Sequence, residues 1–417
     1  MDEAVATTSQ DAAPVAPKRR GRRKRPAIVK ANLVGGANIV VLQRHLERLR
    51  AAHGHPNRQL HLDNLTVALL YAFYNPTCRS LRTLEGLGKV CQQEIGVDQL
   101  CRSTTSAAMA LFDAKLLLPI ITDLRSRLPA LGRADADLEE ITRRIIAADG
   151  SYFNIYADVA WAIHLTRSNG KAAAQVRLNF QLDVEDWTPA AMSVSGKAQG
   201  SETAAVAKDL LGGVIYLVDR NFIDFDFFHA VLDKGSDFVV RCRGNAPNFL
   251  AQKDRPLTDK DRAGGVVSDR IGILPGRGAP GRMMRELILC DPLTHKTIRV
   301  LTSLLDVPAH LIGVLYRQRW QIELFLRWLK VWGNFEHLIS HTRNGLTIQF
   351  YVAVIGVLLT YLSTGHRVSK YAVSMLTFVA SGQATLEDIL PVLEKREREK
   401  RLERERLARK RAQKLGQ

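Results

Sequence analysis

The spacing of apolar residues predicts a helical region first and a strand-rich region after it. Apolar positions recur at helical intervals within residues 39–49, 65–73 and 105–118, and this periodicity predicts amphipathic helices. Ser103 stands just before the third segment, where it is expected to cap that helix. Residues 31–138 are therefore interpreted as a helical region.

From Arg144 onwards the pattern changes to that of β-strands. Three consecutive strands, typical of an antiparallel meander, are expected at residues 145–155, 174–183 and 190–194. A helix is expected to begin near Ser201, followed by a strand at 214–218, a helix at 224–232 and a strand at 237–241. Because strands and helices alternate here, the sequence predicts a mixed α/β sheet with crossover helices.

Residues 246–305 form a third region, in which Gly and Pro punctuate short strands at 286–290 and 297–301. This composition predicts a β-rich insertion. After Pro308 one long helix is expected to run to about Trp332.

A further apolar segment, residues 346–362, falls just short of the roughly 20 residues that a membrane-spanning helix needs. Thr347, Gln349 and Thr360 interrupt it. A helix that is apolar all round also suits the centre of a large core, so a buried helix is predicted.

The formal net charge of +17 is concentrated at the two ends of the chain. An acid-free run near the N-terminus holds Lys18, Arg19, Arg20, Arg22, Arg23, Lys24, Arg25 and Lys30. Clustered cations attract polyanions, so this run predicts contact with nucleic-acid phosphates, although a purely solubilising tail is the alternative. Residues 394–417 mix eleven Lys or Arg with five Glu, which favours a solvated helix with internal ion pairs.

The cysteines and the N-terminal residues bear on location. Five cysteines lie far apart without a C-x-x-C pair, which argues against a zinc ribbon or a disulfide framework. The first seventeen residues contain no apolar stretch of the kind that a secretory signal requires. The sequence therefore predicts a cytoplasmic protein.

Three carboxylates stand where a catalytic site could form. Asp149 follows the apolar run 145–148 and Asp219 follows 214–218, so each is expected at the carboxyl end of a strand, where the active sites of open α/β sheets lie. Glu323 is expected on the long helix. If the three converge, they supply the hard oxygen ligands that hold Mg²⁺ together with a substrate phosphate.

Glu323 belongs to a polar stripe on its helix. Tyr316, Arg319, Glu323 and Lys330 fall within an arc of roughly 60° at about 100° per residue. Taken alone, the stripe is equally typical of ion pairs on a solvated face and of the lining of a site. The two strand-end aspartates favour the site.

The spacing of this stripe resembles a known signature. It matches the YREK signature of the DDE transposases called insertion-sequence family four. Two residues separate Tyr316 from Arg319, three separate Arg319 from Glu323, and six separate Glu323 from Lys330. Three further motifs agree in their order along the chain, namely Asp149-Gly150-Ser151, Gly200-Ser201-Glu202-Thr203 and Asp219-Arg220-Asn221-Phe222. The resemblance covers about residues 140–365.

The resemblance implies an RNase H-like catalytic core, at 139–245 and 306–365, interrupted by the β-rich insertion at 246–305. It also implies that the helical region, 31–138, binds DNA. Residues 1–30 are expected to be a basic, disordered arm, and 366–417 a helical, charged tail. In this family Gly usually stands where this chain has Asn221, and Asn tolerates the left-handed backbone that a turn there would need.

The implied activity is that of a DNA transposase, which cleaves the ends of an insertion element and transfers the strands into target DNA. Asp149, Asp219 and Glu323 would be the catalytic residues and would hold two Mg²⁺ ions, which Mn²⁺ could replace. Arg319 and Lys330 would contact phosphates, and Tyr316 would pack or hydrogen-bond near the DNA.

The implied partners are double-stranded DNA, as element ends and as target, and a second copy of the chain in a homodimer on the DNA. Neither a membrane nor a small-molecule cofactor is expected, and the location would be the bacterial cytoplasm at the nucleoid. Two alternatives stay open. One is a transposase-derived protein that binds DNA without strand transfer, and the other is a hydrolytic nuclease built on the same core.

Overall fold

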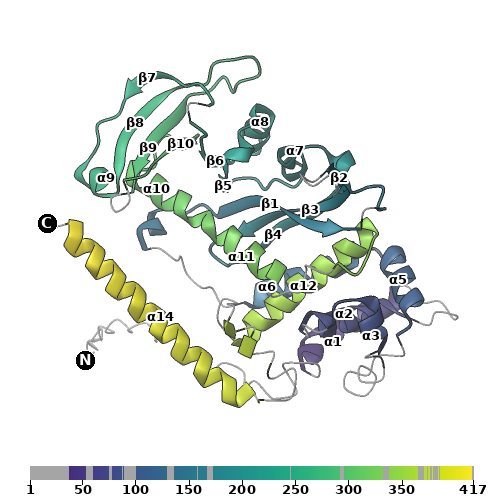
Figure 1. Cartoon of the computed structure of the whole chain (residues 1–417). Coiled ribbons are helices and arrows are strands. Elements are labelled where there is room, and N and C mark those ends of the chain that lie inside the picture. The colour runs from purple at the N-terminus through teal and green to yellow at the C-terminus, as the bar shows by residue number, and fades with distance from the viewer. Residues whose placement is uncertain are drawn as a thin grey trace, which may run out of the picture.

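The structure is a computed structural model, and Figure 1 shows the whole chain. It describes residues 37–52, 60–74, 78–86, 88, 100–128, 136–156, 158–166, 172–244, 246–291, 295–331, 338–364, 371–372, 374–375, 378, 384 and 386–415. The predicted basic arm, residues 1–30, lies outside these residues.

The N-terminal part is helical, as the apolar periodicity predicts. Its helices include α1 (Ala37–Ala51), α2 (Leu62–Tyr74), α3 (Leu81–Gly86), α5 (Arg102–Leu111) and α6 (Leu118–Arg127). The single helix predicted at 105–118 is wrong, because α5 ends at Leu111 and Asp113 then caps a separate short turn by accepting from the Lys115 amide. The predicted cap is wrong too. Ser103 lies inside α5, and Cys101 occupies the N-cap position.

The core sheet contains the predicted meander followed by parallel strands. Antiparallel pairs join β1 (Ile145–Ile155) to β3 (Ala172–Asp183), and β3 to both β4 (Thr188–Ser195) and β2 (Ile163–Thr166). On the other side, β5 (Ile215–Val218) runs parallel to β1, and β6 (Asp237–Arg241) runs parallel to β5. The helices α7 (Glu202–Ala207) and α8 (Phe225–Asp233) lie in the connections before β5 and β6, because parallel neighbours need crossovers. This confirms the mixed α/β, RNase H-like fold class.

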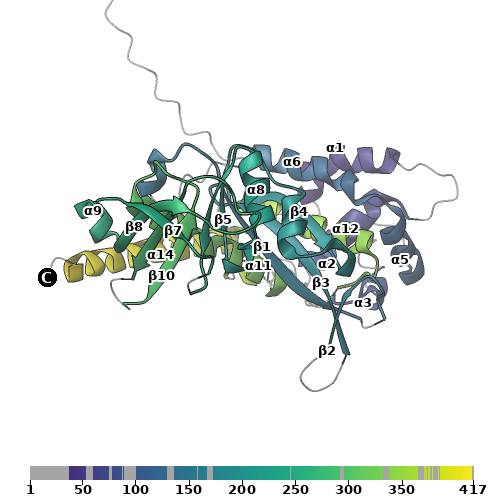
Figure 2. The same ribbon diagram turned by 90° about the horizontal axis from the view of Figure 1, so that it is seen from above.

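The strands of the predicted insertion extend this sheet. They are β7 (Leu250–Asp254), β8 (Val266–Ile273), β9 (Met284–Cys290) and β10 (Thr297–Thr302), with the short helix α9 (Asp259–Ala263) before β8. Because β10 pairs antiparallel with β6, the order of the sheet continues from the core as β6-β10-β9-β8-β7. Figures 1 and 2 show these strands at one end of the molecule and the N-terminal helices at the other.

The helix predicted after Pro308 is divided in two. α10 (Ala309–Gln318) ends one residue before Arg319, and α11 (Trp320–Val331) follows it directly. The chain tightens at this point, since the Arg319 amide donates to the Tyr316 carbonyl and the Ile322 amide donates to the Arg319 carbonyl. These i to i−3 bonds are typical of 3₁₀ turns at helix ends.

The next helix, α12 (Arg343–Thr364), is the core helix of the molecule. Its segment Arg343–Leu362 is long and apolar enough to cross a membrane, but 83% of its apolar stretch is buried inside the structure. It packs against α2, α5 and α6, which confirms the predicted buried helix. The last helix, α14 (Leu386–Leu415), carries ion pairs between Arg396 and Glu399 and between Glu397 and Lys400.

The two faces of the central strands bury different cores. Odd-numbered residues of β1 and β5 join the larger core, to which α10, α11 and α12 contribute. Even-numbered residues join a second core, to which α7 and α8 contribute. Since side chains of a strand alternate between its faces, residue number tells which helices a side chain of β1 or β5 faces.

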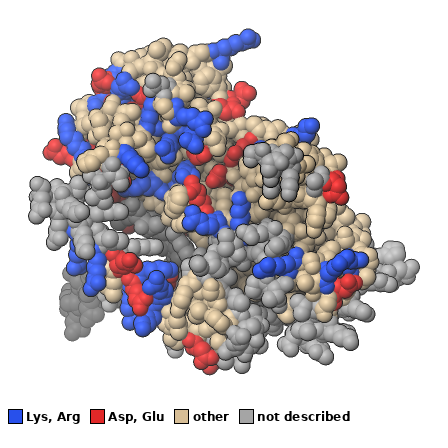
Figure 3. All heavy atoms as spheres, in the orientation of Figure 1, with Lys and Arg blue, Asp and Glu red and all other residues tan. Residues whose placement is uncertain are grey.

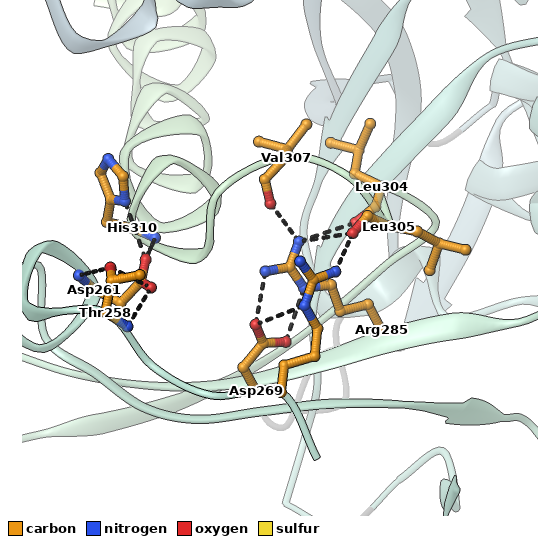
Figure 4. Close-up of polar contacts among 9 residues, drawn as sticks. Thr258, Asp261, Asp269, Arg285, Leu304, Leu305, Val307 and His310 are labelled. Atoms are coloured by element: carbon orange, nitrogen blue, oxygen red, sulfur yellow. Dashed lines mark hydrogen bonds and ion pairs between the residues drawn. The ribbon is translucent and has the colours of Figure 1, made fainter. Parts of the chain in front are cut away.

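A buried ion pair ties the insertion strands to the segment that leads into α10 (Figure 4). Arg285 on β9 is 0% exposed and donates to both carboxylate oxygens of Asp269 on β8, at 2.8 and 2.7 Å. Its Nη1 donates to the carbonyl of Val307, just before α10. One guanidinium therefore links three segments.

Asp261 in α9 makes a second link to α10 (Figure 4). Its Oδ2 accepts from the amide and the hydroxyl of Thr258, at 2.9 and 2.7 Å, and its Oδ1 accepts from the His310 amide at 2.9 Å. Burial raises the pKa of Asp261, but the hydrogen bonds from Thr258 and His310 outweigh burial and hold the pKa well below its usual range.

Asp261→Asn is expected to destabilise the protein at neutral pH and to matter less in acid. A carboxylate whose pKa is lowered on folding stabilises the fold above its unfolded pKa of about 3.9, and this contribution disappears as the pH falls through the folded value. Urea unfolding should show a loss of about 2 kcal/mol at pH 7 and a smaller loss at pH 3. Asp259→Asn, on the exposed side of the same helix, is the control. Equal losses at both pH values would contradict this account of Asp261.

Candidate functional site

Asp149 and Asp219 lie side by side on one face of the sheet. In the parallel pairing of β1 with β5, Ala147 stands opposite Leu217, so residues 149 and 219 are each two positions further along. Both continue the odd-numbered face, because the backbone at Asp219 is still extended. The two carboxylates are close enough that Asp219 raises the pKa of Asp149. They therefore form a pair on the face that α11 covers.

The prediction that Asp149 ends its strand is wrong. Asp149 lies in the middle of β1, which continues to Ile155 and pairs Asp149 with Phe180 of β3. Only the pairing with β5 ends before Asp149, since β5 stops at Val218. Among the described strands, Asp149 is thus left without a partner on the β5 side because β5 is shorter than β1.

The surroundings of Asp149 are strongly negative. Burial, and then the carboxylates of Glu202 and Asp219, raise the pKa of Asp149 to about 7, while the Gly150 amide and Arg319 oppose this shift. The Gly150 amide donates to Asp149 Oδ1 at 2.8 Å. Such a clustering of like charges is typical of a site that binds a cation.

Sequence reasoning did not assign Glu202 to the site. It stands in the Gly200-Ser201-Glu202-Thr203 motif, whose place along the chain supports the family resemblance but gives Glu202 no role. In the structure it is the first residue of α7, and its carboxylate acts on the pKa of Asp149. The available signal was a carboxylate, a possible metal ligand, within a family motif. Nothing in the spacing of the sequence indicates that this carboxylate lies near Asp149.

Asp219 is held by the turn that follows β5. Its carboxylate accepts from the Asn221 amide at 2.8 Å and caps the 3₁₀ turn Arg220–Phe222. The left-handed turn expected at Asn221 is wrong, because the only described residues other than Gly with positive φ are Trp187 and His295. Asn221 therefore fits here without the conformational freedom of Gly.

Arg319 connects Glu323 to the aspartate pair. It stands between α10 and α11, and its Nη2 donates to Glu323 Oε1 at 2.6 Å. The Arg319 side chain is 14% exposed, its Nε is buried without a hydrogen-bond partner in the described chain, and its charge lowers the pKa of Asp149. Glu323 is half-buried and bound to Arg319, the cation that also acts on Asp149.

Tyr316 and Lys330 also face the aspartates. Burial raises the pKa of Tyr316, which lies near Arg319, Arg241 and Asp219. The Lys330 ammonium lies 5.0 Å from the centre of the Phe153 ring on β1, and burial lowers its pKa against the opposing charge of Asp149. The predicted stripe therefore lines the site in the described part of α10 and α11.

The donor set fits a divalent cation, although the side chains are not arranged as a ready-made metal site. Within the described residues, no three His, Cys, Asp or Glu side chains are grouped so that they could hold an ion. Yet carboxylate oxygens are the ligands that Mg²⁺ and Mn²⁺ prefer, and Glu202 Oε1 is buried without a hydrogen bond. Binding a cation here would satisfy that oxygen and offset the repulsion at Asp149.

The surface of the molecule also carries basic side chains. Figure 3 shows Lys and Arg gathered over the insertion strands, with acidic side chains among them near the middle of this face. The cations predicted to bind DNA from the N-terminal arm, Lys18, Arg19, Arg20, Arg22, Arg23, Lys24 and Arg25, lie outside the described residues.

Comparison with known proteins gives a family match over the core. The model of a family described as the transposase DDE domain matches residues 140–359. The chain is 26% identical over 178 residues to the probable transposase for insertion sequence element IS5377 of Geobacillus stearothermophilus, which covers 42% of this chain and 47% of that protein. Protein y4zB of Sinorhizobium fredii, named as a candidate transposase, is 23% identical over 219 residues, or 51% of this chain and 59% of that protein.

The chain thus spans about half the length of the curated relatives that it matches. Among solved structures, it is similar to the piggyBac transposase in a synaptic complex with hairpin DNA. That alignment has a TM-score of 0.37 and 11% identity, and it covers 89% of this chain and 83% of that one.

Proposed function

Because the chain belongs to the transposase DDE-domain family, we propose that it is an insertion-element transposase of the YREK-signature group. It cleaves DNA at the ends of the element and joins the freed ends to target DNA. One observation carries this proposal. Asp149 and Asp219 lie side by side on adjacent parallel strands, and they face the polar stripe of Tyr316, Arg319, Glu323 and Lys330.

Asp149, Asp219 and Glu323 are proposed to hold two divalent ions, with Mg²⁺ as the physiological ion and Mn²⁺ as a substitute. When bound, such ions activate the attacking oxygen and stabilise the leaving 3′ oxygen. Glu323 must exchange its bond to Arg319 to take part. This exchange frees the Arg319 guanidinium, whose Nε already lacks a partner, to donate to a phosphate.

The proposed partner is double-stranded DNA, as element ends and as target. Lys330 and Tyr316 lie along the same stripe and would contact the strand next to the cleavage site. The basic surface over the insertion strands (Figure 3) would bind the flanking backbone, and the N-terminal arm would add sequence-independent affinity. A homodimer on the DNA and a bacterial cytoplasmic location at the nucleoid belong to the same proposal.

The test uses the DNA that surrounds the gene. The protein is incubated with Mg²⁺, a labelled linear duplex that carries the sequences on both sides of the gene, and a supercoiled plasmid as target. Cleavage at a defined end, followed by labelled plasmid, is the expected result. Cleavage without joined product would favour the hydrolytic nuclease, and binding without cleavage would favour the DNA-binding protein without strand transfer.

Two residues of the stripe are expected to have different roles, Glu323 in binding metal and Lys330 in binding DNA. Glu323 and Lys330 are seven residues apart, or about 10.5 Å along a helix axis, so they cannot serve the same atom. Glu323→Asp is expected to raise the Mn²⁺ concentration for half-maximal cleavage at saturating DNA. Lys330→Ala should weaken DNA binding and leave that concentration unchanged.

Metal titrations of both variants at saturating DNA, with gel-shift affinities, test this division. Arg327→Ala is the control, because Arg327 is exposed on the same helix and lies over the Trp320 ring. A Lys330→Ala protein with normal DNA affinity and a raised metal requirement would reverse the assignment.

A further inference from the structure

We infer that Glu202 is a fourth carboxylate of the proposed metal site and ligates a divalent cation together with Asp149 and Asp219. This inference rests on the proposed function, because it adds a ligand to the site of that function. Under this inference Glu202 holds the ion. Under the structural alternative, Glu202 would only hold α7 in place.

The start of α7 fixes Glu202 against the strands. Ser201 caps the helix by accepting from the Ala204 amide at 3.1 Å, and Thr203 donates to Asp224 at 2.6 Å. Arg177 of β3 is buried and donates to the carbonyls of Gly200 and Ser201, at 3.1 and 2.9 Å. Because its neighbours on both sides are anchored, Glu202 itself is not needed to hold the helix in place.

Gly150 makes the room that the Glu202 carboxylate occupies. Gly150 is an even-numbered residue of β1, on the face that α7 covers, and a Cβ placed on it would lie 2.5 Å from Glu202 Oε1. No real Cβ approaches an oxygen so closely, so any side chain at this position would push the carboxylate away. The absence of a side chain at residue 150 thus lets Glu202 come next to Asp149.

Once there, one oxygen of the carboxylate has no protein group to satisfy it. Glu202 Oε1 is buried and accepts no hydrogen bond within the described chain, although the Gly150 backbone acts on the carboxylate and lowers its pKa. Arg177, whose charge lowers the pKa of Glu202, has its Nε bonded to Asn179 and its Nη2 bonded to carbonyls. An unsatisfied buried carboxylate is costly, and a second one close to it raises the cost.

The geometry gives a cation ligands from both faces of the strand. Asp149 and Asp219 stand on the face that α11 covers, whereas Glu202 reaches past Gly150 from the face that α7 covers. Burial and the charge of Asp219 raise the pKa of Glu202, against the Gly150 backbone and Arg177. A divalent cation is the ligand class that removes this repulsion and takes oxygen donors from several directions.

The test measures Mn²⁺ binding to the full chain without DNA, by isothermal titration calorimetry, so that it does not depend on cleavage. Glu202→Gln is expected to weaken Mn²⁺ binding by about tenfold or more, the scale on which even outer-shell partners of a metal act. Gly150→Ala should weaken binding in the same direction, because its Cβ displaces the carboxylate. Asp226→Asn is the control, since Asp226 also lies in the first turn of a helix, α8, but is exposed.

Melting temperatures without metal separate ligation from a structural role. Glu202→Gln removes one of three neighbouring negative charges, so the metal-free variant should melt at the same temperature as the unaltered protein or higher. A lower melting temperature with unchanged Mn²⁺ affinity would overturn the inference and make Glu202 structural.

Asp149→Asn distinguishes failure of this inference from failure of the proposed function. If Asp149→Asn loses Mn²⁺ binding and Glu202→Gln keeps it, the metal site stands and Glu202 is not part of it. If the unaltered chain binds no Mn²⁺, the proposed metal site and the role of Glu202 both fall.

Discussion

Asp149→Asn and Asp219→Asn proteins are expected to lose DNA cleavage almost completely while they still bind DNA. Each aspartate supplies charged oxygens at the level where β1 and β5 part, and the amide of Asn is a far weaker ligand for a divalent cation. Losing about 4 kcal/mol of transition-state stabilisation corresponds to a rate about a thousandfold lower. DNA affinity should change little, because these residues are assigned to metal and the DNA contacts to the stripe and the basic surface.

Cleavage rates and gel-shift affinities from the same preparations check this result. Asp226→Asn provides the control for loss of a carboxylate outside the site. Neither site variant should lower the melting temperature of the metal-free protein, since each removes one member of a repelling cluster. A variant that cuts DNA at a near-normal rate would show that its aspartate does not belong to the catalytic set.

The nearness of Asp149 and Asp219 could be predicted from sequence because local patterns determine where the two residues lie. The apolar run at residues 145–148 and the strand at 215–218 place each aspartate just beyond a buried segment. Parallel pairing of these two segments then brings the aspartates to one level. The pairing itself is a long-range contact, but the alternation of strands and helices is enough to suggest it.

Glu202 could not be assigned to the site in this way, because its position depends on what is missing from another residue. Its carboxylate reaches Asp149 only through the space at Gly150, and no periodicity in the sequence links the two. The break at Arg319 escaped prediction for a similar reason. Apolar spacing continues across it, and the change to i to i−3 hydrogen bonds appears only in the folded chain.

The insertion shows the same limit at a larger scale. Its Gly and Pro punctuation indicates strands, yet the pairing of β10 with β6 that adds them to the core sheet is not encoded locally. The buried ion pair within the insertion, between Arg285 of β9 and Asp269 of β8, is another case, because the charges of these two residues would suggest an exposed surface. Charged residues are rarely buried unless they are paired, so the sequence alone predicts that both residues are exposed.

Arg285→Leu is expected to destabilise the protein by about 3 to 5 kcal/mol, the usual loss when one partner of a buried ion pair is removed. Asp269, which is 3% exposed, would keep only the more distant Arg255, whose Nε lies 3.6 Å from its Oδ2. The Val307 carbonyl would lose its donor. Arg270→Leu is the matched control. Its partner Glu286 keeps a hydrogen-bonded cation, Arg299, and the Arg270 side chain is 39% exposed. The loss should therefore be nearer that of a surface pair, about 1 kcal/mol or less.

The double variant Arg285→Leu with Asp269→Leu identifies the cause of that loss. If the penalty comes from a buried carboxylate that has lost its hydrogen-bonded cation, removing both charges should recover stability, because apolar replacements of a buried pair are often neutral. Free energies of unfolding from urea titrations should therefore rank the double variant above Arg285→Leu alone. The Val307 carbonyl lacks its guanidinium donor in both proteins, so this contact cancels from the comparison. A double variant less stable than the single one would show that packing between β8 and β9, and not charge, makes Arg285 necessary.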